Sequence, residues 1–387
     1  MQIRDWIVCA ALALGACGSA PAPEREHVLP VAAPLAADSH QWVQLQPQPI
    51  ELDGRLIEPT CSGAPGSDPA YAFWAKRGSR DALVVYFDGG GACWDDVTCG
   101  VPIFAQAGGR SEGFYKAELL PGDEPARMGG IFDLANPRNP VRDWSFVFVP
   151  YCTGDVHSGA NTATYRDIDT GRPYRIEHRG ADNFRIVLEW MRANFDAPEQ
   201  ILVAGSSAGA YGAATHYAAI RDLFPDARAV MLGDAGQGVT TTDFLEHRNG
   251  NWRYQLPASV FGPNAQLTPD DDIVGRLAAH FPNDRFAQYT TAQDRTQAGF
   301  YALMGASNAC RAWTEKMARD LTRRQAAPNY RSYLAAGQSH TILRDRLFYS
   351  EQSGGVPFAE WFAALLNGDS ENRACEDCLA VTGRCQF

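Results

Sequence analysis

The sequence has no apolar run long enough to cross a bilayer as a helix, which argues against an integral membrane protein. Positive charge is also scarce, because 45 Asp and Glu outweigh 34 Lys and Arg and give a formal net charge of −11. This balance disfavours nucleic acid or an anionic membrane surface as the ligand. No internal repeat occurs. With 45% hydrophobic residues in 387, the chain can build one large core, which we place in a single domain over residues 41–387.

The N-terminus is predicted to be a secretion signal. An arginine precedes a short apolar run, and the sequence LGAC, which ends at Cys17, resembles a bacterial lipobox. We therefore expect a lipoprotein-type signal peptide over residues 1–16 and a Pro- and Ala-rich tether over residues 17–40. Gly18 in place of Asp suggests transport to an outer membrane, and a lipid on Cys17 is the only membrane contact expected. Ordinary signal-peptide cleavage, giving a periplasmic or secreted protein, is the alternative.

Eight of the ten cysteines remain when Cys9 and Cys17 of the N-terminal signal sequence are set aside, and an even count in an exported chain indicates disulfides. Cys93 and Cys99 are close enough to bridge across one loop, whereas the other pairings stay open. Cys375-x-x-Cys378 has a spacing that is also found in zinc sites, but no histidine follows at ligand spacing, so no metal is expected. The eight are Cys61, Cys93, Cys99, Cys152, Cys310, Cys375, Cys378 and Cys385.

A glycine-rich turn with a central serine joins a predicted strand to a predicted helix over residues 200–217. The strand is short and apolar, and the helix is rich in small residues that can pack closely on a sheet. Between them, Gly205 to Gly209 fits G-x-S-x-G, a turn that strains the backbone of its central residue and points the hydroxyl out of the sheet. The pattern predicts Ser207 as a nucleophile. The alternative is that Ser207 only caps the helix.

Three consecutive glycines follow an earlier predicted strand, Leu83 to Phe87. Bare backbone amides can approach a ligand closely, because no side chain obstructs them. In an α/β-hydrolase this loop supplies half of an oxyanion hole, and the amide after the nucleophile supplies the other half. We therefore predict Gly90, Gly91 and Ala208 as oxyanion-hole donors. A phosphate-binding or merely flexible loop is the alternative, although no nucleotide-binding glycine pattern follows.

Two later residues complete the order Ser, acid, His that this fold uses at successive strand ends. Asp294 lies just beyond a predicted strand over residues 285–291, and His340 follows the last predicted strand. His340 would take the proton from Ser207, and Asp294 would fix the histidine tautomer from a distance of about 2.6 to 3.2 Å. Asp234, after the first strand beyond the serine, is a rival for the acidic role.

The remaining candidates are assigned to packing or to the pocket. Asp155 and His157 precede the serine motif, so we expect them to brace a loop or line the pocket. His216 lies roughly two to three helical turns from Ser207, which is too far for a base, and is assigned to packing. Residues 240–282 mix aromatic residues with polar residues and proline, and are predicted to form a cap over the site, with ordinary surface structure as the alternative.

Six motifs together resemble the pectin acetylesterase and Notum family of carboxylesterases, in its bacterial branch: YFDGGGACW, VPYCTGDVHSG, GSSAG, GDAG, TAQDRTQ and GQSHTIL. The resemblance implies an α/β-hydrolase-like fold, with a mostly parallel sheet flanked by helices and with loop or cap insertions. It implies a triad of Ser207, Asp294 and His340 and no cofactor. Plant and animal members carry a tryptophan around the glycine loop, where this chain has Gly91-Ala92, with Trp94 displaced past Cys93.

The sequence therefore predicts an exported, monomeric serine carboxylesterase that removes short O-acyl groups from a carbohydrate or a related ester. A catalytically silent, lipid-anchored binding protein on the same fold is the alternative, in which the glycine loop would hold a ligand. A serine peptidase on this fold is less favoured, because nothing suggests an added propeller or peptide-binding domain.

Overall fold

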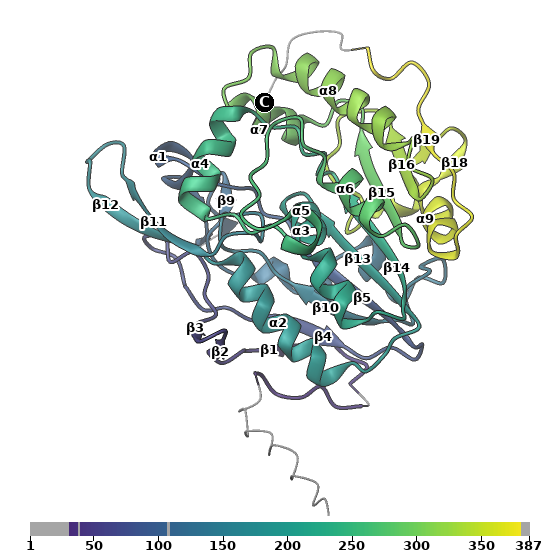
Figure 1. The fold of residues 1–387 in the computed structure, drawn as a ribbon, viewed down its shortest axis with the longest axis horizontal. Coiled ribbons are helices and arrows are strands. Elements are labelled where there is room, and N and C mark those ends of the chain that lie inside the picture. Colours follow the sequence, from purple (N-terminus) through teal and green to yellow (C-terminus); the bar gives the residue numbers. More distant parts are fainter. Residues whose placement is uncertain (1–30, 38, 107–108, 381–387) are drawn as a thin grey trace, which may run out of the picture.

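The structure, a computed structural model, describes residues 31–37, 39–106 and 109–380. In this part of the chain nine strands form one sheet, in the order β1-β4-β10-β5-β13-β14-β15-β16-β19 (Figure 1). The strands from β10 to β19 are parallel, and β4 is antiparallel to both of its neighbours. The predicted mostly parallel sheet is confirmed. Its strands are β1 (Val43–Leu45), β4 (Phe73–Lys76), β5 (Ala82–Phe87), β10 (Ser145–Val149), β13 (Gln200–Ser206), β14 (Arg228–Asp234), β15 (Arg285–Thr291), β16 (Tyr330–Ala335) and β19 (Arg373–Ala374).

Helices cover both faces of the sheet, because its strands are apolar on both sides. In β5, Val85 faces the side of α2 (Gly180–Asn194), α3 (Ala208–Leu223), α6 (Ile273–His280) and α8 (Ala309–Arg324). Its neighbours Val84 and Tyr86 face the opposite side, which α9 (Phe358–Asn367) and the 3₁₀ turn η3 (Gly130–Phe132) cover. The alternation of side chains along each strand thus builds two apolar layers.

All candidate residues of the site follow strands that run in one direction. The glycine loop follows β5, Ser207 follows β13, Asp294 follows β15 and His340 follows β16. Since these strands are parallel neighbours, their carboxyl ends meet at the same edge of the sheet, where α/β folds bind ligands.

Beyond this edge, a cap lies over the site. Its helices α4 (Thr242–Trp252) and α5 (Ala258–Phe261) share a small apolar cluster with Ala92 and Trp94 of the glycine loop. The predicted cap over residues 240–282 extended too far, because α6 packs on α3 and β15 as part of the main helical layer.

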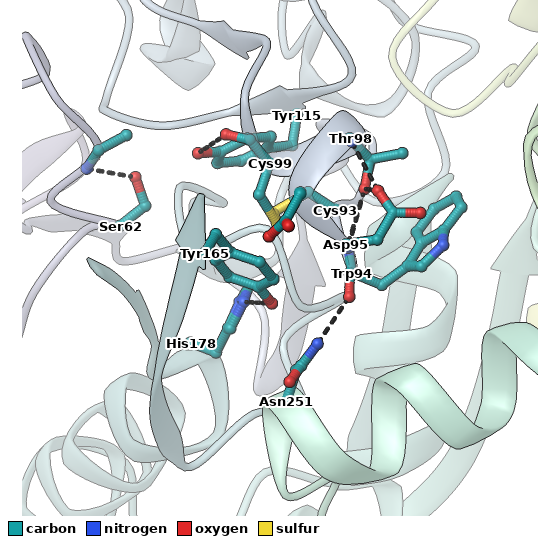
Figure 2. Close-up of a disulfide and its surroundings, with 12 residues drawn as sticks. Ser62, Cys93, Trp94, Asp95, Thr98, Cys99, Tyr115, Tyr165, His178 and Asn251 are labelled. Atoms are coloured by element: carbon teal, nitrogen blue, oxygen red, sulfur yellow. Dashed lines mark hydrogen bonds between the residues drawn. A yellow bond between two sulfur atoms is a disulfide. The ribbon is translucent and has the colours of Figure 1, made fainter. Parts of the chain in front are cut away.

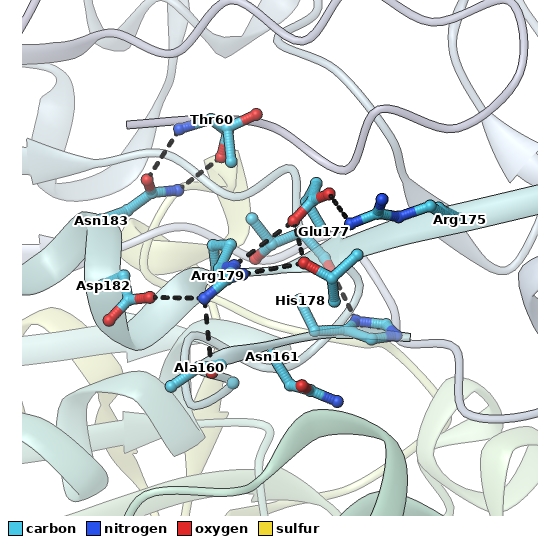
Figure 3. Close-up of polar contacts among 12 residues, drawn as sticks. Thr60, Ala160, Asn161, Arg175, Glu177, His178, Arg179, Asp182 and Asn183 are labelled. Carbon is cyan, nitrogen blue, oxygen red and sulfur yellow. Dashed lines mark hydrogen bonds and ion pairs between the residues drawn. The ribbon is translucent and has the colours of Figure 1, made fainter. Parts of the chain in front are cut away.

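The hairpin of β11 (Asn161–Arg166) and β12 (Pro173–His178) projects from the same side of the molecule as α4 (Figure 1). Arg179 fastens its base, as Figure 3 shows, by donating to the Ala160 carbonyl, to Thr162 Oγ1 and to Glu177, and by pairing with Asp182 of α2 at 3.2 Å.

The other short elements are β2 (Ile50–Leu52), β3 (Arg55–Ile57), α1 (Asp96–Cys99), β6 (Pro102–Ile103), β7 (Ala105–Gln106), β8 (Gly109–Arg110), β9 (Tyr115–Lys116), η1 (Pro121–Asp123), η2 (Pro125–Arg127), α7 (Arg295–Leu303), η4 (Arg346–Tyr349), β17 (Gln352–Ser353) and β18 (Val356–Pro357).

Disulfides fasten the loops around the sheet. The described pairs are Cys61–Cys152, Cys93–Cys99 and Cys375–Cys378. The predicted bridge between Cys93 and Cys99 is present, and the zinc interpretation of the last pair is not supported, because its sulfurs are bonded to each other. Such bridges are typical of exported proteins.

The N-terminal predictions fall mostly outside the described residues, which exclude the signal peptide and Cys17. Residues 31–37, at the end of the predicted tether, are packed on the domain: Leu35 is buried, its amide donates to Asn194 Oδ1, and the Trp190 indole donates to the Ala33 carbonyl. The folded body thus starts before residue 41. Among the described residues, no helix has the length and apolar character needed to span a bilayer.

Candidate active site

Ser207 lies in the sharp turn between β13 and α3. Its φ of 57° and ψ of −122° belong to a region that non-glycine residues seldom adopt, and its amide donates to the Asp234 carbonyl at 2.7 Å. This strained turn is the geometry of a nucleophile elbow. It places the serine at the start of α3, where the helix amides favour negative charge.

Close backbone contacts explain the glycines around this serine. A Cβ on Gly205 would lie 2.1 Å from the Gly209 carbonyl oxygen, and one on Gly209 would lie 2.0 Å from the Phe87 carbonyl oxygen. Gly89 approaches the turn from β5, since its Cβ would lie 2.5 Å from the Ser206 carbonyl oxygen. Strand, elbow and glycine loop are therefore packed backbone to backbone.

His340 and Asp294 are in direct contact. His340 Nδ1 lies 2.8 Å from Asp294 Oδ2, within the range expected for this pair, and the carboxylate is fully buried. The other ring nitrogen, Nε2, has no hydrogen-bond partner among the described residues. His340 and Ser207 line the same cavity. The Asp294 carboxylate thus binds Nδ1, and Nε2 is left to accept a proton from the Ser207 hydroxyl.

Gln297 holds the acid in place. Asp294 is the N-cap of α7 and accepts from the Gln297 amide at 2.9 Å, and the Gln297 side chain donates to Asp294 Oδ2 at 3.0 Å. The Gln297 side-chain oxygen accepts from the Gln237 amide at 2.9 Å. We did not identify Gln297 from the sequence, although Asp-x-x-Gln before a helix is a capping signature that could have identified it.

Asp234, the rival acid, binds elsewhere. Its carboxylate accepts from Ser206 Oγ and from the amides of Ile342 and Leu343 at 2.9 to 3.0 Å. Burial raises the pKa of Asp234, while these donors lower it. Since Ile342 and Leu343 follow His340 closely, Asp234 anchors the loop that carries the histidine.

Two of the three predicted oxyanion donors lie on the cavity. Gly91 and Ala208 line it, whereas Gly90 does not and packs against Tyr151 and Lys116. Gly91 has a φ of +77°, and a Cβ there would lie 1.9 Å from the Phe114 carbonyl oxygen, so only glycine fits. Gly91 forms an isolated β-bridge with Tyr115, whose hydrogen bonds run from the Ala92 amide to the Phe114 carbonyl and from the Lys116 amide to the Gly90 carbonyl. The Gly91 amide takes part in neither bond.

A network of buried ion pairs supports the glycine loop through Asp88, the residue that precedes the three glycines. Asp88 is fully buried and pairs with Lys116 at 2.5 Å and with Arg344, and Lys116 also pairs with Asp123 at 2.6 Å. Burial raises the pKa of Asp88, but Arg344 and Lys116 outweigh it, so the net shift is downward. Lys116 belongs to the short strand β9 and Asp123 to the 3₁₀ turn η1.

Asp155 and His157 brace the loop after β10, one of the two roles predicted for them, and His216 of α3 packs against this loop. Burial raises the pKa of Asp155 to about 6, and its carboxylate accepts from Thr153 Oγ1 and from the Gly180 amide at the start of α2. His157 Nε2 lies 2.8 Å from the Asp88 carbonyl, and His216 Nε2 lies 2.6 Å from the His157 carbonyl. Burial lowers the pKa of His157 to about 4 and that of His216 to about 3, so both rings are neutral packing groups.

Only one group of potential metal ligands occurs in the described ranges, and it does not fit a metal. Cys93, Cys99 and His178 lie together, but the two sulfurs form a disulfide (Figure 2). His178 Nδ1 lies 2.9 Å from the Thr153 carbonyl, and its Nε2 lies 2.8 Å from Tyr165 Oη. All candidate ligand atoms are therefore already used.

A cavity of about 110 Å³ lies over Ser207, between the sheet edge and the cap. Its wall is largely apolar and includes Ala92 and Val156 from the loops and Phe244 and Leu245 from α4. Trp94 does not line the cavity but packs on Phe244 at 4.9 Å between ring centroids. Figure 2 shows how the cap is joined to this loop: the Asn251 side chain donates to the Trp94 carbonyl at 2.8 Å.

Two curated proteins are similar to parts of the chain. The palmitoleoyl-protein carboxylesterase notum1 of Xenopus laevis is 28% identical over 186 residues, which is 46% of this chain and 34% of that protein. Pectin acetylesterase 7 of Arabidopsis thaliana is 27% identical over 183 residues, which is 46% of this chain and 43% of that protein. The chain thus spans less than half the length of the curated relatives it matches.

The fold is similar to that of the Wnt deacylase Notum from Drosophila, in two crystal forms. The TM-scores are 0.54 and 0.53 at 16% identity, covering 83% and 86% of this chain and 93% and 96% of the Notum chains. This confirms the predicted α/β-hydrolase-like fold. A pectinacetylesterase family model matches residues 58–296, more than half of the chain, including Ser207 and Asp294. The motifs, the fold and this match agree: the chain belongs to the pectinacetylesterase family.

Proposed function

We propose that the protein is a serine carboxylesterase that removes O-acyl groups from an ester substrate. The observation that carries this proposal is the constellation at one sheet edge. A strained Ser207 lines one cavity with His340, whose Nε2 has no partner in the described ranges and whose Nδ1 is held by Asp294 at 2.8 Å. Family membership and the two esterases among the relatives support the same reaction class.

In this mechanism Ser207 Oγ attacks the ester carbonyl carbon while His340 Nε2 accepts the hydroxyl proton. The amides of Gly91 and Ala208 donate to the oxyanion that forms. Collapse of this intermediate breaks the bond to the alcohol oxygen, which leaves with the proton from His340. Water then attacks the acyl-serine by the same route in reverse and releases the carboxylic acid. Asp294 keeps the proton on Nδ1 and stabilises the imidazolium at each step.

A fluorophosphonate probe tests the reaction class, because it labels only an activated serine. We expect the purified protein to hydrolyse p-nitrophenyl acetate and to be labelled at Ser207. A silent binding protein on this fold would show neither, and its glycine loop would hold a ligand without turnover. An unlabelled, inactive protein with a native thermal transition would therefore refute the esterase.

For the substrate, we propose a short acyl group on a carbohydrate or a related ester. The cavity volume of about 110 Å³ supports a small acyl group. We expect kcat/KM to fall from acetyl to butyryl to octanoyl esters of one alcohol, by roughly tenfold or more over the series, because a longer chain would overfill the cavity. A clear preference for the octanoyl ester would contradict this proposal.

We also propose that the protein is exported and anchored through a lipid on Cys17, with an outer membrane as the destination. The lipobox-like sequence supports the anchor, and the disulfides support export. Cys17→Ser is expected to abolish labelling by a radioactive fatty acid and to block maturation in the native host. Soluble export of this variant at the wild-type level would instead favour ordinary cleavage. Esterase activity provides the control, since Cys17 is remote from the catalytic motifs in the sequence.

A further inference from the structure

The cavity over Ser207 carries one positive charge that no acidic side chain of the described residues balances. Arg324 also lines the cavity, but it pairs with Asp272 at 2.7 Å. The cavity-lining acid Asp271 pairs with Arg276 at 3.6 Å. Arg248 of α4 remains, and no carboxylate of the described residues lies within ion-pair distance of it.

Arg248 is held in place without a counter-ion from the described part of the chain. Only 5% of it is exposed. Its Nε and Nη2 donate to Asn249 Oδ1 at 3.3 and 3.1 Å, and its guanidinium carbon lies 3.9 Å from the ring centre of Tyr254. Tyr254 Oη in turn lies 3.1 Å from Thr215 Oγ1 of α3. Nη1 has no hydrogen-bond partner among the described residues, and burial lowers the pKa of Arg248.

A buried guanidinium without a counter-ion is costly, and stacking on an aromatic ring offsets only part of that cost. Arg276 on α6 provides a comparison within the chain. It stacks on Phe261 at 4.5 Å, but its side chain is 44% exposed and it pairs with Asp271. The stack on Tyr254 alone therefore does not account for a charge placed in the wall of the cavity.

We propose that Arg248 is a specificity-determining residue that binds a carboxylate carried by the ester substrate. The inference deepens the proposed function and rests on it. The arginine fork matches a carboxylate in shape and charge, and the Tyr254 stack keeps it oriented before the substrate arrives. Because the surrounding wall is apolar, this contact is shielded from water and separates anionic from neutral esters.

Matched pairs of esters test this directly and show which part of the substrate carries the carboxylate. For the alcohol part the pair is 4-acetoxybenzoate and 4-acetoxybenzamide; for the acyl part it is phenyl hydrogen adipate and phenyl hexanoate. We expect kcat/KM to favour the anionic ester in one pair by about tenfold or more.

Arg248→Met should remove most of this preference, and Arg248→Lys should keep part of it. The control Arg138→Met, which removes an arginine stacked on Tyr349 at 4.9 Å outside the cavity wall, should keep it all.

A second measurement uses the wild type and so does not depend on how the variants fold. The products that keep the substrate carboxylate, 4-hydroxybenzoate or adipate, should inhibit competitively at about tenfold lower concentration than their counterparts without it, 4-hydroxybenzamide or hexanoate. Equal rates within both pairs, or a preference that survives in a folded Arg248→Met, would overturn the assignment while the esterase stands. Absence of hydrolysis and of fluorophosphonate labelling would instead refute the esterase itself.

Discussion

Replacing Ser207 by alanine is expected to lower kcat for p-nitrophenyl acetate by at least roughly 10³-fold. The loss is large because the serine oxygen forms the covalent intermediate, and neither His340 nor the amides of Gly91 and Ala208 can replace it. KM should change little, because the cavity wall stays the same. Stopped assays at high enzyme concentration, with thermal unfolding as a check on folding, measure both quantities.

The neighbouring Ser206 provides a matched control. Its hydroxyl is buried between Tyr86 Oη at 2.7 Å and the Asp234 carboxylate, and so points away from the cavity that Ser207 lines. Ser206→Ala should therefore still be labelled by a fluorophosphonate, whereas Ser207→Ala should not. Full activity in Ser207→Ala, or loss of labelling only in Ser206→Ala, would show that the turn had been misassigned.

The sequence predicted those parts of the molecule that local patterns determine. Apolar runs marked the central strands, and β15 has the bounds expected for it, Arg285–Thr291. The spacing of Gly205 and Gly209 around Ser207 predicted an elbow, because backbone contacts under about 3 Å leave no room for any other residue at either position. These features depend on chain neighbours, so one sequence is sufficient to identify them.

The sequence did not predict contacts that only the tertiary fold creates. Arg248 lies in the predicted cap, but no local pattern marks it as facing the site, and only the folded structure places it in the cavity wall. Lys116 pairs with both Asp88 and Asp123, and the irregular loops that bring them together have no periodic pattern. Gly90 and Gly91 are adjacent and identical in type, and only the bridge to Tyr115 decides which of them lines the cavity. In each case the contacting residue is distant in the sequence or cannot be identified from the sequence alone.

Asp294→Asn is expected to lower kcat by several orders of magnitude while leaving the fold intact. The Gln297 amide donates to Asp294 Oδ1 and would keep the new amide oxygen there, so the amide nitrogen would face His340 Nδ1. Nδ1 would then have to accept a hydrogen bond, which moves the proton to Nε2. In that tautomer His340 cannot take the proton from Ser207.

Asp234→Asn tests the other role, in which an aspartate anchors the loop that carries His340. Asp234 accepts from Ser206 and from the amides of Ile342 and Leu343, so the variant should lose roughly 1 to 3 kcal/mol of unfolding free energy, because an amide satisfies fewer of these donors. Its kcat should fall far less than in Asp294→Asn, because the contact between Asp294 and His340 remains.

Measuring kcat and unfolding free energy in both variants therefore distinguishes the acid from the anchor. A loss confined to kcat identifies the residue that controls the histidine proton, and a loss mainly of stability identifies the residue that holds the histidine loop. The opposite result, a nearly silent Asp294→Asn together with an inactive but stable Asp234→Asn, would exchange the two roles. It would require the His340 loop to move, since in the present geometry Asp234 binds backbone amides beyond His340 and Asp294 binds its ring.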